Sequence, residues 1–424
     1  MIKRDFYLSK LVRSMWNGEV KVITGIRRCG KSVLLFELFR NHLLSEGIAE
    51  EQIIRIELDQ RRYYRYRNPV TLCDYVESVV RAEREKRFFL LIDEVQLTEK
   101  FVDRENGGIT VTIYDMLNEL RAYENLDVYV TGSNSKGLSS DIATEFRGRA
   151  TQIRVYPLSF SEFYSVHGGE ERKALEEYMI YGGMPKVTAL EDDSEKKNYL
   201  SSLYDLLYLR DIVERNHIER PDILSDILDF LASGIGSLTN PTNIANSLVS
   251  IRKEKINPAM AAGYVQCTVD SFLIQVAKRY DVKGKSYFKF PNKYYYTDLG
   301  LRNARLNFRQ FDPGHIMENI IYNELVRRGY SVDVGVVRRR TENSNEQKEI
   351  DFVVNSGDKR VYIQSALRME TDRKGAAETE PLFLTGDFFR KIVIRMDISR
   401  NYHDENGIWH LGLTDFLLGK ADLF

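Results

Sequence analysis

The segment Gly25–Ser32 constrains the fold of this chain more than any other, because it reads G-x-x-x-x-G-K-S and stands between an apolar stretch and an amphipathic one. Such a loop connects a strand to the helix that follows it, and the glycines let backbone N–H groups approach a phosphate. Lys31 offers a positive charge for the β- and γ-phosphates, and Ser32 offers a hydroxyl to Mg²⁺. The loop predicts a site for ATP and Mg²⁺, with contacts from Gly25, Ile26, Arg27, Arg28, Cys29, Gly30, Lys31, Ser32 and Val33.

A pair of acidic residues completes the chemistry that this loop needs. The apolar stretch Phe88–Ile92 ends in Asp93 and Glu94. In P-loop ATPases an acid at this place holds Mg²⁺, and a neighbouring residue orients the attacking water. We therefore assign Asp93, together with Ser32, to the metal and Glu94 to water activation. The glutamate favours a hydrolase over a nucleotide kinase, which needs a second substrate pocket instead.

The first third of the chain alternates strand-like and helix-like stretches. This alternation predicts an α/β fold with a parallel sheet covered by helices. The strands are expected at residues 20–24, 53–58, 88–92, 128–131 and 151–155.

Polar residues after the fourth of these strands are candidates for sensing the γ-phosphate. We place Asn134 first and Ser133 second, and the alternative is an ordinary exit from strand to loop. Further on, Arg147 and Arg149 are candidates for an arginine finger that a neighbouring subunit supplies. The alternative for these arginines is a surface pair or a contact to a lid. Lys31, Glu94, Asn134, Arg147 and Arg149 thus form the predicted catalytic set.

Several motifs together resemble a widespread bacterial and archaeal family of AAA-type ATPases that carry a C-terminal domain of unknown function. The motifs are Gly25–Ser32 with Arg27-Arg28, Asp93-Glu94-Val95-Gln96, Thr131-Gly132-Ser133-Asn134, and Arg147-Gly148-Arg149 followed by Pro157-Leu158-Ser159-Phe160-Ser161-Glu162-Phe163. The resemblance covers nearly the whole chain and implies a P-loop ATPase core, a winged helix and a restriction-endonuclease-like end. We expect the core at 1–156, a helical lid at 157–220, the winged helix at 221–305 and a degenerate restriction-endonuclease-like α/β domain at 306–424.

The expected winged helix ends in a basic hairpin. Two strand-like runs, 276–281 and 287–290, follow three helical stretches, which is the element order of that motif. Residues 251–300 contain nine Lys or Arg and four Asp or Glu, a local charge of +5 in a chain whose net charge is −1. Such a patch favours DNA phosphates, with Lys283, Lys285 and Lys289 as contacts. The alternative is a winged helix that binds protein or serves as a rigid spacer.

The C-terminal part has the spacing of a metal-dependent nuclease but lacks one residue. Glu318 on a helix expected at 317–328, Asp351 on a strand and Gln364 on the next strand resemble the acidic residues that bind Mg²⁺ in the restriction-endonuclease-like superfamily. The lysine of that motif is replaced by Ala366. We therefore favour a non-cleaving nucleic-acid or protein-binding role over a structural remnant, and we rank an active Mg²⁺-dependent DNA nuclease last.

One further basic segment, Arg61–Arg67, interleaves arginine and tyrosine. This pattern suits single-stranded nucleic acid, which binds through stacking and charge. A solvated loop is the alternative, and it is the one that we favour.

The remaining composition narrows the setting. The three cysteines lie far apart, without the spacing of a zinc site or disulfide framework, and no apolar run has the length of a membrane helix. We expect a cytoplasmic Mg²⁺-dependent ATPase coupled to DNA binding, with a homo-oligomer and a protein partner as further candidates. The alternative function is an ATP-gated protein-interaction switch with slow turnover.

Overall fold

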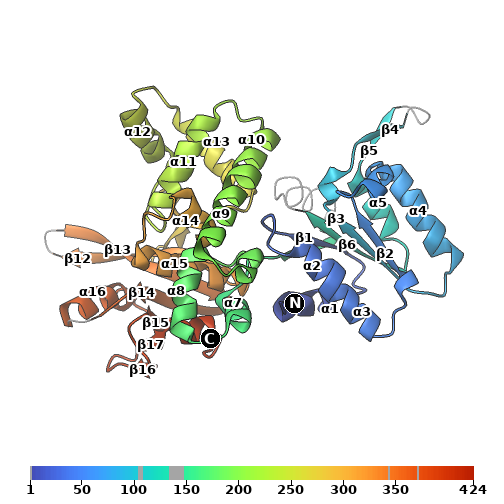
Figure 1. The fold of residues 1–424 in the computed structure, drawn as a ribbon. Helices are drawn as coiled ribbons and strands as arrows, with labels where there is room; N and C mark the ends of the chain where they lie inside the picture. The colour runs from blue at the N-terminus through green and yellow to red at the C-terminus, as the bar shows by residue number, and fades with distance from the viewer. Residues whose placement is uncertain (1, 104–107, 133–147, 342–343, 370–371) are drawn as a thin grey trace. The chain divides into compact units, whose positions relative to one another are not determined.

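The computed structural model describes residues 2–103, 108–132, 148–341, 344–369 and 372–424 (Figure 1). They form two compact units. Unit 1 contains residues 1–156 and 270–272, and unit 2 contains residues 157–269 and 273–424. The subdivision of unit 2 into lid, winged helix and nuclease-like domain stays a prediction. Within the described ranges, no helix combines the length and the apolarity that crossing a membrane requires.

Unit 1 is built on a five-stranded parallel sheet. Its strands run in the order β2-β3-β6-β1-β7, and every pairing is parallel. The five expected strands are confirmed: β1 (Val20–Thr24) has the expected bounds, and one or both ends are shifted by one or two residues in β2 (Ile53–Glu57), β3 (Phe88–Asp93), β6 (Leu126–Gly132) and β7 (Ala150–Arg154). Strands β4 (Phe101–Asp103) and β5 (Ile109–Val111) form a separate antiparallel pair.

Helices cover both faces of this sheet. On one face, α4 (Pro69–Ala82) and α5 (Ile113–Leu120) share a core with alternate sheet residues such as Leu90 and Val128 (Figure 1). On the other face, Phe39 contacts the rings of Phe89 and Tyr129. Phe39 belongs to a continuous helical segment made of α2 (Lys31–Val33), the π-helical η1 (Leu34–Phe39) and α3 (Arg40–Ser45), beside α1 (Asp5–Arg13). The short 3-10 turns are η2 (Glu50–Gln52), η3 (Arg61–Arg67) and η4 (Val95–Leu97).

Unit 2 begins with a helical region. Its elements are α7 (Phe160–His167), α8 (Glu171–Tyr181), η5 (Pro185–Ala189), α9 (Asp193–Leu203), η6 (Tyr204–Leu209), α10 (Arg210–Asn216), α11 (Pro221–Ser233), α12 (Pro241–Arg252), α13 (Pro258–Asp270) and α14 (Leu299–Arg305). Ser159 caps α7 by accepting from the Glu162 N–H at 3.2 Å, while the Glu162 carboxylate accepts from the Ser159 N–H at 2.9 Å. A Cβ on Gly183 would lie 2.1 Å from the Leu158 carbonyl oxygen. The Pro-Leu-Ser-Phe motif therefore has a structural explanation.

The rest of unit 2 contains an eight-stranded mixed sheet in the order β10-β9-β12-β13-β14-β15-β17-β16. Helix α15 (Pro313–Arg327) contacts β12, β13 and β14, and α16 (Asp372–Phe383) contacts β13 and β14. The strands are β9 (Arg279–Asp281), β10 (Ser286–Tyr287), β12 (Ser331–Thr341), β13 (Ser344–Ser356), β14 (Lys359–Ala366), β15 (Arg390–Arg395), β16 (Tyr402–His403) and β17 (Trp409–Gly412), and α17 (Leu413–Leu417) follows. Strands β8 (Ile274–Ala277) and β11 (Lys293–Tyr296) pair separately.

Two expectations for unit 2 need correction. The basic hairpin forms as β9 and β10, but β9 also pairs in parallel with β12, so the hairpin is the edge of the large sheet. The helix that carries Glu318 begins at Pro313 rather than at residue 317, because the Asp312 carboxylate accepts from the N–H groups of Gly314 and His315 and caps it.

Candidate functional site

Residues outside the phosphate loop of unit 1 fix the conformation of its backbone. Gly25 has φ +147°, and a Cβ there would lie 2.1 Å from the Val155 carbonyl oxygen, so no larger residue fits. The buried Arg4 guanidinium donates to the carbonyl oxygens of Cys29 at 3.0 Å and Tyr156 at 2.7 Å. Sequence reasoning missed Arg4, because a basic residue near the start of a chain carries no signal of burial. The loop backbone is thus fixed on two sides.

The Lys31 side chain folds back onto the backbone of the phosphate loop. Its side chain is buried, and Nζ donates to the carbonyl oxygens of Gly25 at 3.0 Å and Ile26 at 3.1 Å. These two bonds hold the ammonium group against the backbone of the loop. The Cys29 thiol is buried beside the Val155 carbonyl oxygen at 3.5 Å, so Cys29 contributes its backbone to the loop and not its sulfur.

The acidic pair lies next to the loop. Ser32 Oγ donates to Asp93 Oδ2 at 2.7 Å, and Thr131 Oγ1 donates to Asp93 Oδ1. The Glu94 N–H donates to Thr131 Oγ1 at 3.1 Å, and the Gln96 side-chain amide donates to the Glu94 carboxylate. The arrangement joins the predicted metal residues and the predicted water-activating residue through the single hydroxyl of Thr131.

The order of the strands explains this convergence. Strand β6 lies between β1, which leads into the loop, and β3, which ends at Asp93. Parallel strands end at the same edge of a sheet, so the loop, Asp93 and Thr131 meet there. Burial raises the pKa of Asp93, and the hydrogen bonds from Thr131 and Ser32 oppose that rise. Thr131 and Gln96 were present in the motifs, but only the fold reveals which side chains they touch.

The other predicted catalytic residues divide into two groups. Ser133, Asn134 and Arg147 lie outside the described residues. Arg149 is exposed, and its carbonyl oxygen accepts from the Val20 N–H at 3.2 Å, at the start of β1. Because strands rise about 3.3 Å per residue, Arg149 lies one strand length from the phosphate loop of its own chain. A finger role for Arg149 therefore requires a neighbouring subunit.

The arginine-tyrosine segment forms η3, and its arginine and tyrosine side chains contact one another. The guanidinium groups of Arg62, Arg65 and Arg67 lie 4.8, 4.6 and 4.0 Å from the ring centres of tyrosines in the same segment. The Arg67 side chain also donates to the Leu58 carbonyl oxygen at 2.9 Å. These internal contacts account for the pattern without nucleic acid.

In unit 2, the residues predicted for a nuclease-like site come together. Glu318 of α15, Asp351 of β13 and Gln364 of β14 are all buried. The paired part of β13 and β14 starts at Phe352 and Ile363, so Asp351 and Gln364 lie where the two strands separate. Gln364 Oε1 accepts from the Asp351 N–H at 3.2 Å.

A residue that sequence reasoning missed occupies the centre of this group. Lys293, the first residue of β11, is 3% exposed, and its Nζ lies 2.8 Å from Glu318 Oε1 and 2.6 Å from Glu349 Oε1. Burial lowers the pKa of Lys293, but the charges of Glu318, Asp351 and Glu349 outweigh it and hold the pKa above its ordinary value. The burial of Lys293 could not be predicted from the sequence, because a lysine next to tyrosines is typical of a surface position.

The basic hairpin keeps three of its positive charges at the surface. Lys283, Lys285 and Lys289 are exposed. Lys293 is buried among carboxylates, and Arg252 is paired with Asp222 and Asp226. The local charge counted from the sequence therefore overstates the positive charge that this surface offers.

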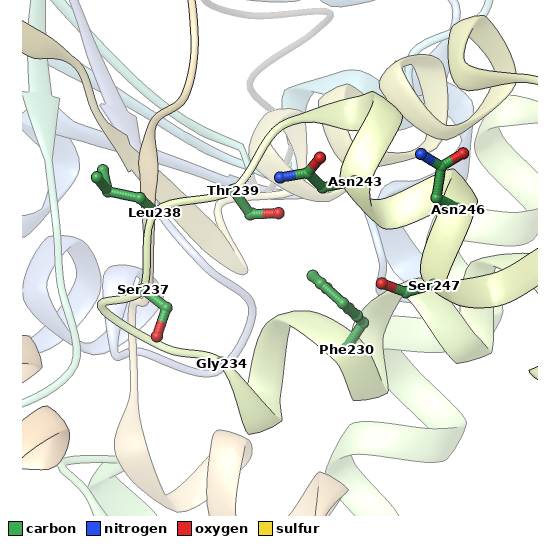
Figure 2. A pocket seen from close by; sticks show the side chains of 8 residues that line it. All are labelled: Phe230, Gly234, Ser237, Leu238, Thr239, Asn243, Asn246 and Ser247. Carbon is green, nitrogen blue, oxygen red and sulfur yellow. The ribbon is translucent and has the colours of Figure 1, made fainter. Parts of the chain in front are cut away.

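A separate pocket lies in the helical region of unit 2, between α11 and α12. Its volume is about 370 Å³, and Figure 2 shows the Phe230 ring and the hydroxyls of Thr239 and Ser247 facing it. The lining residues are Phe230, Gly234, Ser237, Leu238, Thr239, Asn243, Asn246 and Ser247. None of these lining residues carries a charge, so the pocket lacks the cations that a triphosphate needs. It was not identified from the sequence.

Comparison with known proteins agrees with the geometry of unit 1. A family model described as an AAA domain matches residues 17–164, and a model described as a domain of unknown function matches residues 172–312. An uncharacterized protein of Haemophilus influenzae is 34% identical over 426 residues, which cover 99% of each chain. An uncharacterized protein of Methanocaldococcus jannaschii is 28% identical over 395 residues, which cover 88% of this chain and 79% of that protein.

Solved structures are more distant. The structure of the Aeropyrum pernix ORC1 protein in complex with DNA covers 72% of this chain and 92% of that chain, at 12% identity and a TM-score of 0.28. A similarity of this size carries no argument about function. The AAA-domain match and the 34% identity over almost all of both chains show that this chain belongs, with the Haemophilus influenzae protein, to a family of AAA-type P-loop ATPases.

Proposed function

We propose that this chain is a Mg²⁺-dependent ATPase that couples ATP hydrolysis to DNA binding by unit 2. The observation that carries the ATPase is the 2.7 Å hydrogen bond between Ser32 Oγ and Asp93 Oδ2, with Glu94 directly after Asp93. A hydroxyl and a carboxylate that already lie together fit Mg²⁺, which prefers oxygen ligands.

The residues of unit 1 divide the work of hydrolysis. The loop N–H groups and Lys31 bind the phosphates, and Glu94 accepts the proton of the attacking water. Ser32 and Asp93 would hold Mg²⁺, which supplies positive charge to the phosphates when it is bound. Thr131 positions Asp93 and Glu94 relative to each other through its hydroxyl.

The remaining predicted residues act at the γ-phosphate. Asn134 follows the same strand as Thr131 and senses the γ-phosphate. Arg147 or Arg149 completes the site of a neighbouring subunit in a homo-oligomer. The exposed position of Arg149, at the far end of β1 from its own loop, supports action in a neighbour.

The DNA part of the proposal rests on the hairpin of unit 2. Lys283, Lys285 and Lys289 are exposed within a short stretch of chain, as phosphate contacts must be. Hydrolysis in unit 1 then changes how tightly these lysines hold DNA. This role is independent of any cleavage.

The test is the ATPase rate with and without single-stranded, duplex and branched DNA. We expect DNA to raise turnover in the wild type and to have no effect in Lys31→Ala, which loses nucleotide, or in Glu94→Gln, which keeps nucleotide but loses hydrolysis. Glu99→Gln is the matched control, because Glu99 is an exposed acid in the same segment. A Glu94→Gln rate equal to that of the wild type would remove the ATPase assignment.

A second candidate function is an ATP-gated switch that binds a protein partner. The observation that favours it is a group of exposed phenylalanines in the stretch 383–389, from the end of α16 to the residue before β15. Phe383 is 49% exposed, Phe388 is fully exposed and Phe389 is 41% exposed. Large exposed apolar side chains that are grouped along the chain favour contact with a partner. A flat ATPase response to every DNA, together with ATP-dependent assembly that Phe388→Ser abolishes, would favour this function.

A further inference from the structure

The buried carboxylate group of unit 2 already contains a cation that belongs to the chain. Lys293 Nζ lies 2.6 Å from Glu349 Oε1, 2.8 Å from Glu318 Oε1 and 3.9 Å from Asp351 Oδ1. The lysine comes from β11, outside the large sheet, and reaches across to α15 and β13. One ammonium group therefore pairs with carboxylates from two different elements, α15 and β13.

The same carboxylates are fixed by further hydrogen bonds. The Tyr295 hydroxyl donates to Glu318 Oε1 at 2.5 Å, and the Ser365 N–H donates to Asp351 Oδ2 at 2.8 Å. The backbone at Gly236 packs so closely that a Cβ there would lie 3.2 Å from Glu318 Oε1. The carboxylates have little freedom to turn toward another ligand.

A divalent ion does not fit this arrangement. Mg²⁺ needs oxygen ligands at about 2.0–2.1 Å in near-octahedral geometry. Here Nζ occupies the place on which Glu318 and Glu349 converge, and Gln364 Oε1 faces the Asp351 N–H. Among the residues that the structure describes, no group of three or more acidic, histidine or cysteine side chains is arranged to hold a metal ion.

We propose that Lys293 is a permanent internal cation that takes the place of the divalent ion in the nuclease-like region. Its single positive charge offsets part of the negative charge of Glu318, Glu349 and Asp351, and it cannot leave because it belongs to the chain. Unit 2 therefore keeps the packing of a metal-dependent nuclease without taking up the metal. The inference is independent of the ATPase proposal, because every residue in it belongs to unit 2.

The test measures Mn²⁺ binding by calorimetry and thermal unfolding, on the full chain without nucleotide. Wild type is expected to show no Mn²⁺ site that depends on Asp351. Lys293→Met removes the charge at similar side-chain length and should raise Mn²⁺ affinity at least ~10-fold, because it leaves carboxylates without a counterion. Adding Asp351→Asn to Lys293→Met should abolish the gain. Lys289→Met, an exposed lysine just before β11, is the matched control and should leave binding unchanged.

A second variant covers a failure of Lys293→Met to fold. Lys293→Met with Glu318→Gln lowers the uncompensated charge but keeps Glu349 and Asp351, and Mn²⁺ should raise its unfolding temperature but not that of the wild type. The proposal is wrong if the wild type binds Mn²⁺ in a manner that Asp351→Asn abolishes. It is equally wrong if both Lys293 variants, folded with or without Mn²⁺, fail to gain a site. Nicking of plasmid DNA by the wild type that Asp351→Ala abolishes would also overturn it.

Discussion

At the scale of single residues, Thr131 is the side chain that links the two acids of the nucleotide site. Thr131→Val keeps the shape but removes the hydroxyl that contacts Asp93 and the Glu94 N–H. A hydrogen bond to a charged group is worth about 1.5–3 kcal/mol, so we expect kcat to fall roughly 10- to 100-fold. ATP affinity should change little, because Thr131 contacts no phosphate-loop residue directly in these bonds. Steady-state ATPase assays and nucleotide titration measure the two effects.

Thr131→Ser is the conservative control for this prediction. It keeps the hydroxyl on Oγ and loses only a methyl group, so it should restore most of the rate. A Thr131→Val variant with wild-type kcat would show that Asp93 and Glu94 are positioned without the hydroxyl. Equal loss in both variants would indicate a packing role instead.

Asp298 gives a pH-dependent prediction in unit 2. Burial raises its pKa to about 6, against the opposing N–H bonds from Gly183, Leu301 and Gly300. The folded state then binds the proton more tightly than the unfolded state, whose pKa is about 3.9, so the unfolding free energy falls as pH rises from about 4 to about 6. The contribution is about 3 kcal/mol at most, since each pKa unit corresponds to about 1.4 kcal/mol.

The measurement compares the wild type with Asp298→Asn by urea unfolding at several pH values. Other carboxylates titrate equally in both proteins, so the difference between them isolates Asp298. We expect the unfolding free energy of the wild type to rise relative to that of Asp298→Asn as pH is lowered from about 7 to about 4. A difference that stays constant over this range would contradict the raised pKa.

At the scale of secondary-structure elements, a buried ion pair joins β1 and β6. Lys21 is fully buried and pairs with Asp127, which also accepts from the Trp16 N–H at 3.0 Å and the Tyr129 hydroxyl at 2.9 Å. Lys21→Met leaves the Asp127 charge buried without its cation, which should lower the unfolding free energy of unit 1 by about 3–5 kcal/mol. Trp16 fluorescence in a Trp409→Phe background follows unit 1 alone, because the chain has two tryptophans.

The double variant Lys21→Met with Asp127→Asn serves as the second arm of this experiment. It removes the uncompensated charge while keeping an acceptor for Trp16, so it should be more stable than Lys21→Met alone. Lys100→Met, at an exposed site, should match the wild type. If the unfolding free energy of Lys21→Met lies within about 1 kcal/mol of the wild-type value, the pair contributes less to stability than buried ion pairs usually do.

Elements of unit 1 could be predicted from the sequence because their signals are local. The loop at Gly25, the apolar run before Asp93 and the alternation of strand and helix each appear within a short window. Lys293 could not be predicted, because its burial depends on α15 and β13, which lie further along the chain. The position of β9 was missed for the same reason, since its pairing with β12 joins distant segments. Arg4 shows that even a residue next to the predicted site is hidden when its contact is long-range.

At the scale of the whole molecule, the chain joins unit 1, which the AAA-domain model matches, to a larger unit 2 that contains the basic segment 251–300. In the basic segment 251–300, Lys293 and Arg252 are paired, whereas six lysines are exposed: Lys253, Lys255, Lys278, Lys283, Lys285 and Lys289. Electrostatic attraction of DNA to this segment can therefore act through exposed lysines both inside and outside the hairpin. Salt dependence is the measurement that counts such groups.

Reversing the charge of Lys283, Lys285 and Lys289 to Glu should weaken DNA binding for every sequence to a similar degree. Each phosphate contact contributes about 0.9 to the slope of log K against log salt, so the slope should fall by about 3 in magnitude. The basal ATPase rate should not change, since these lysines belong to unit 2. The control reverses Lys173, Lys197 and Lys359, which are exposed elsewhere in unit 2. Equal slopes in the wild type and the hairpin variant would exclude this hairpin as the DNA contact and favour the protein-binding function of the exposed phenylalanines in the stretch 383–389.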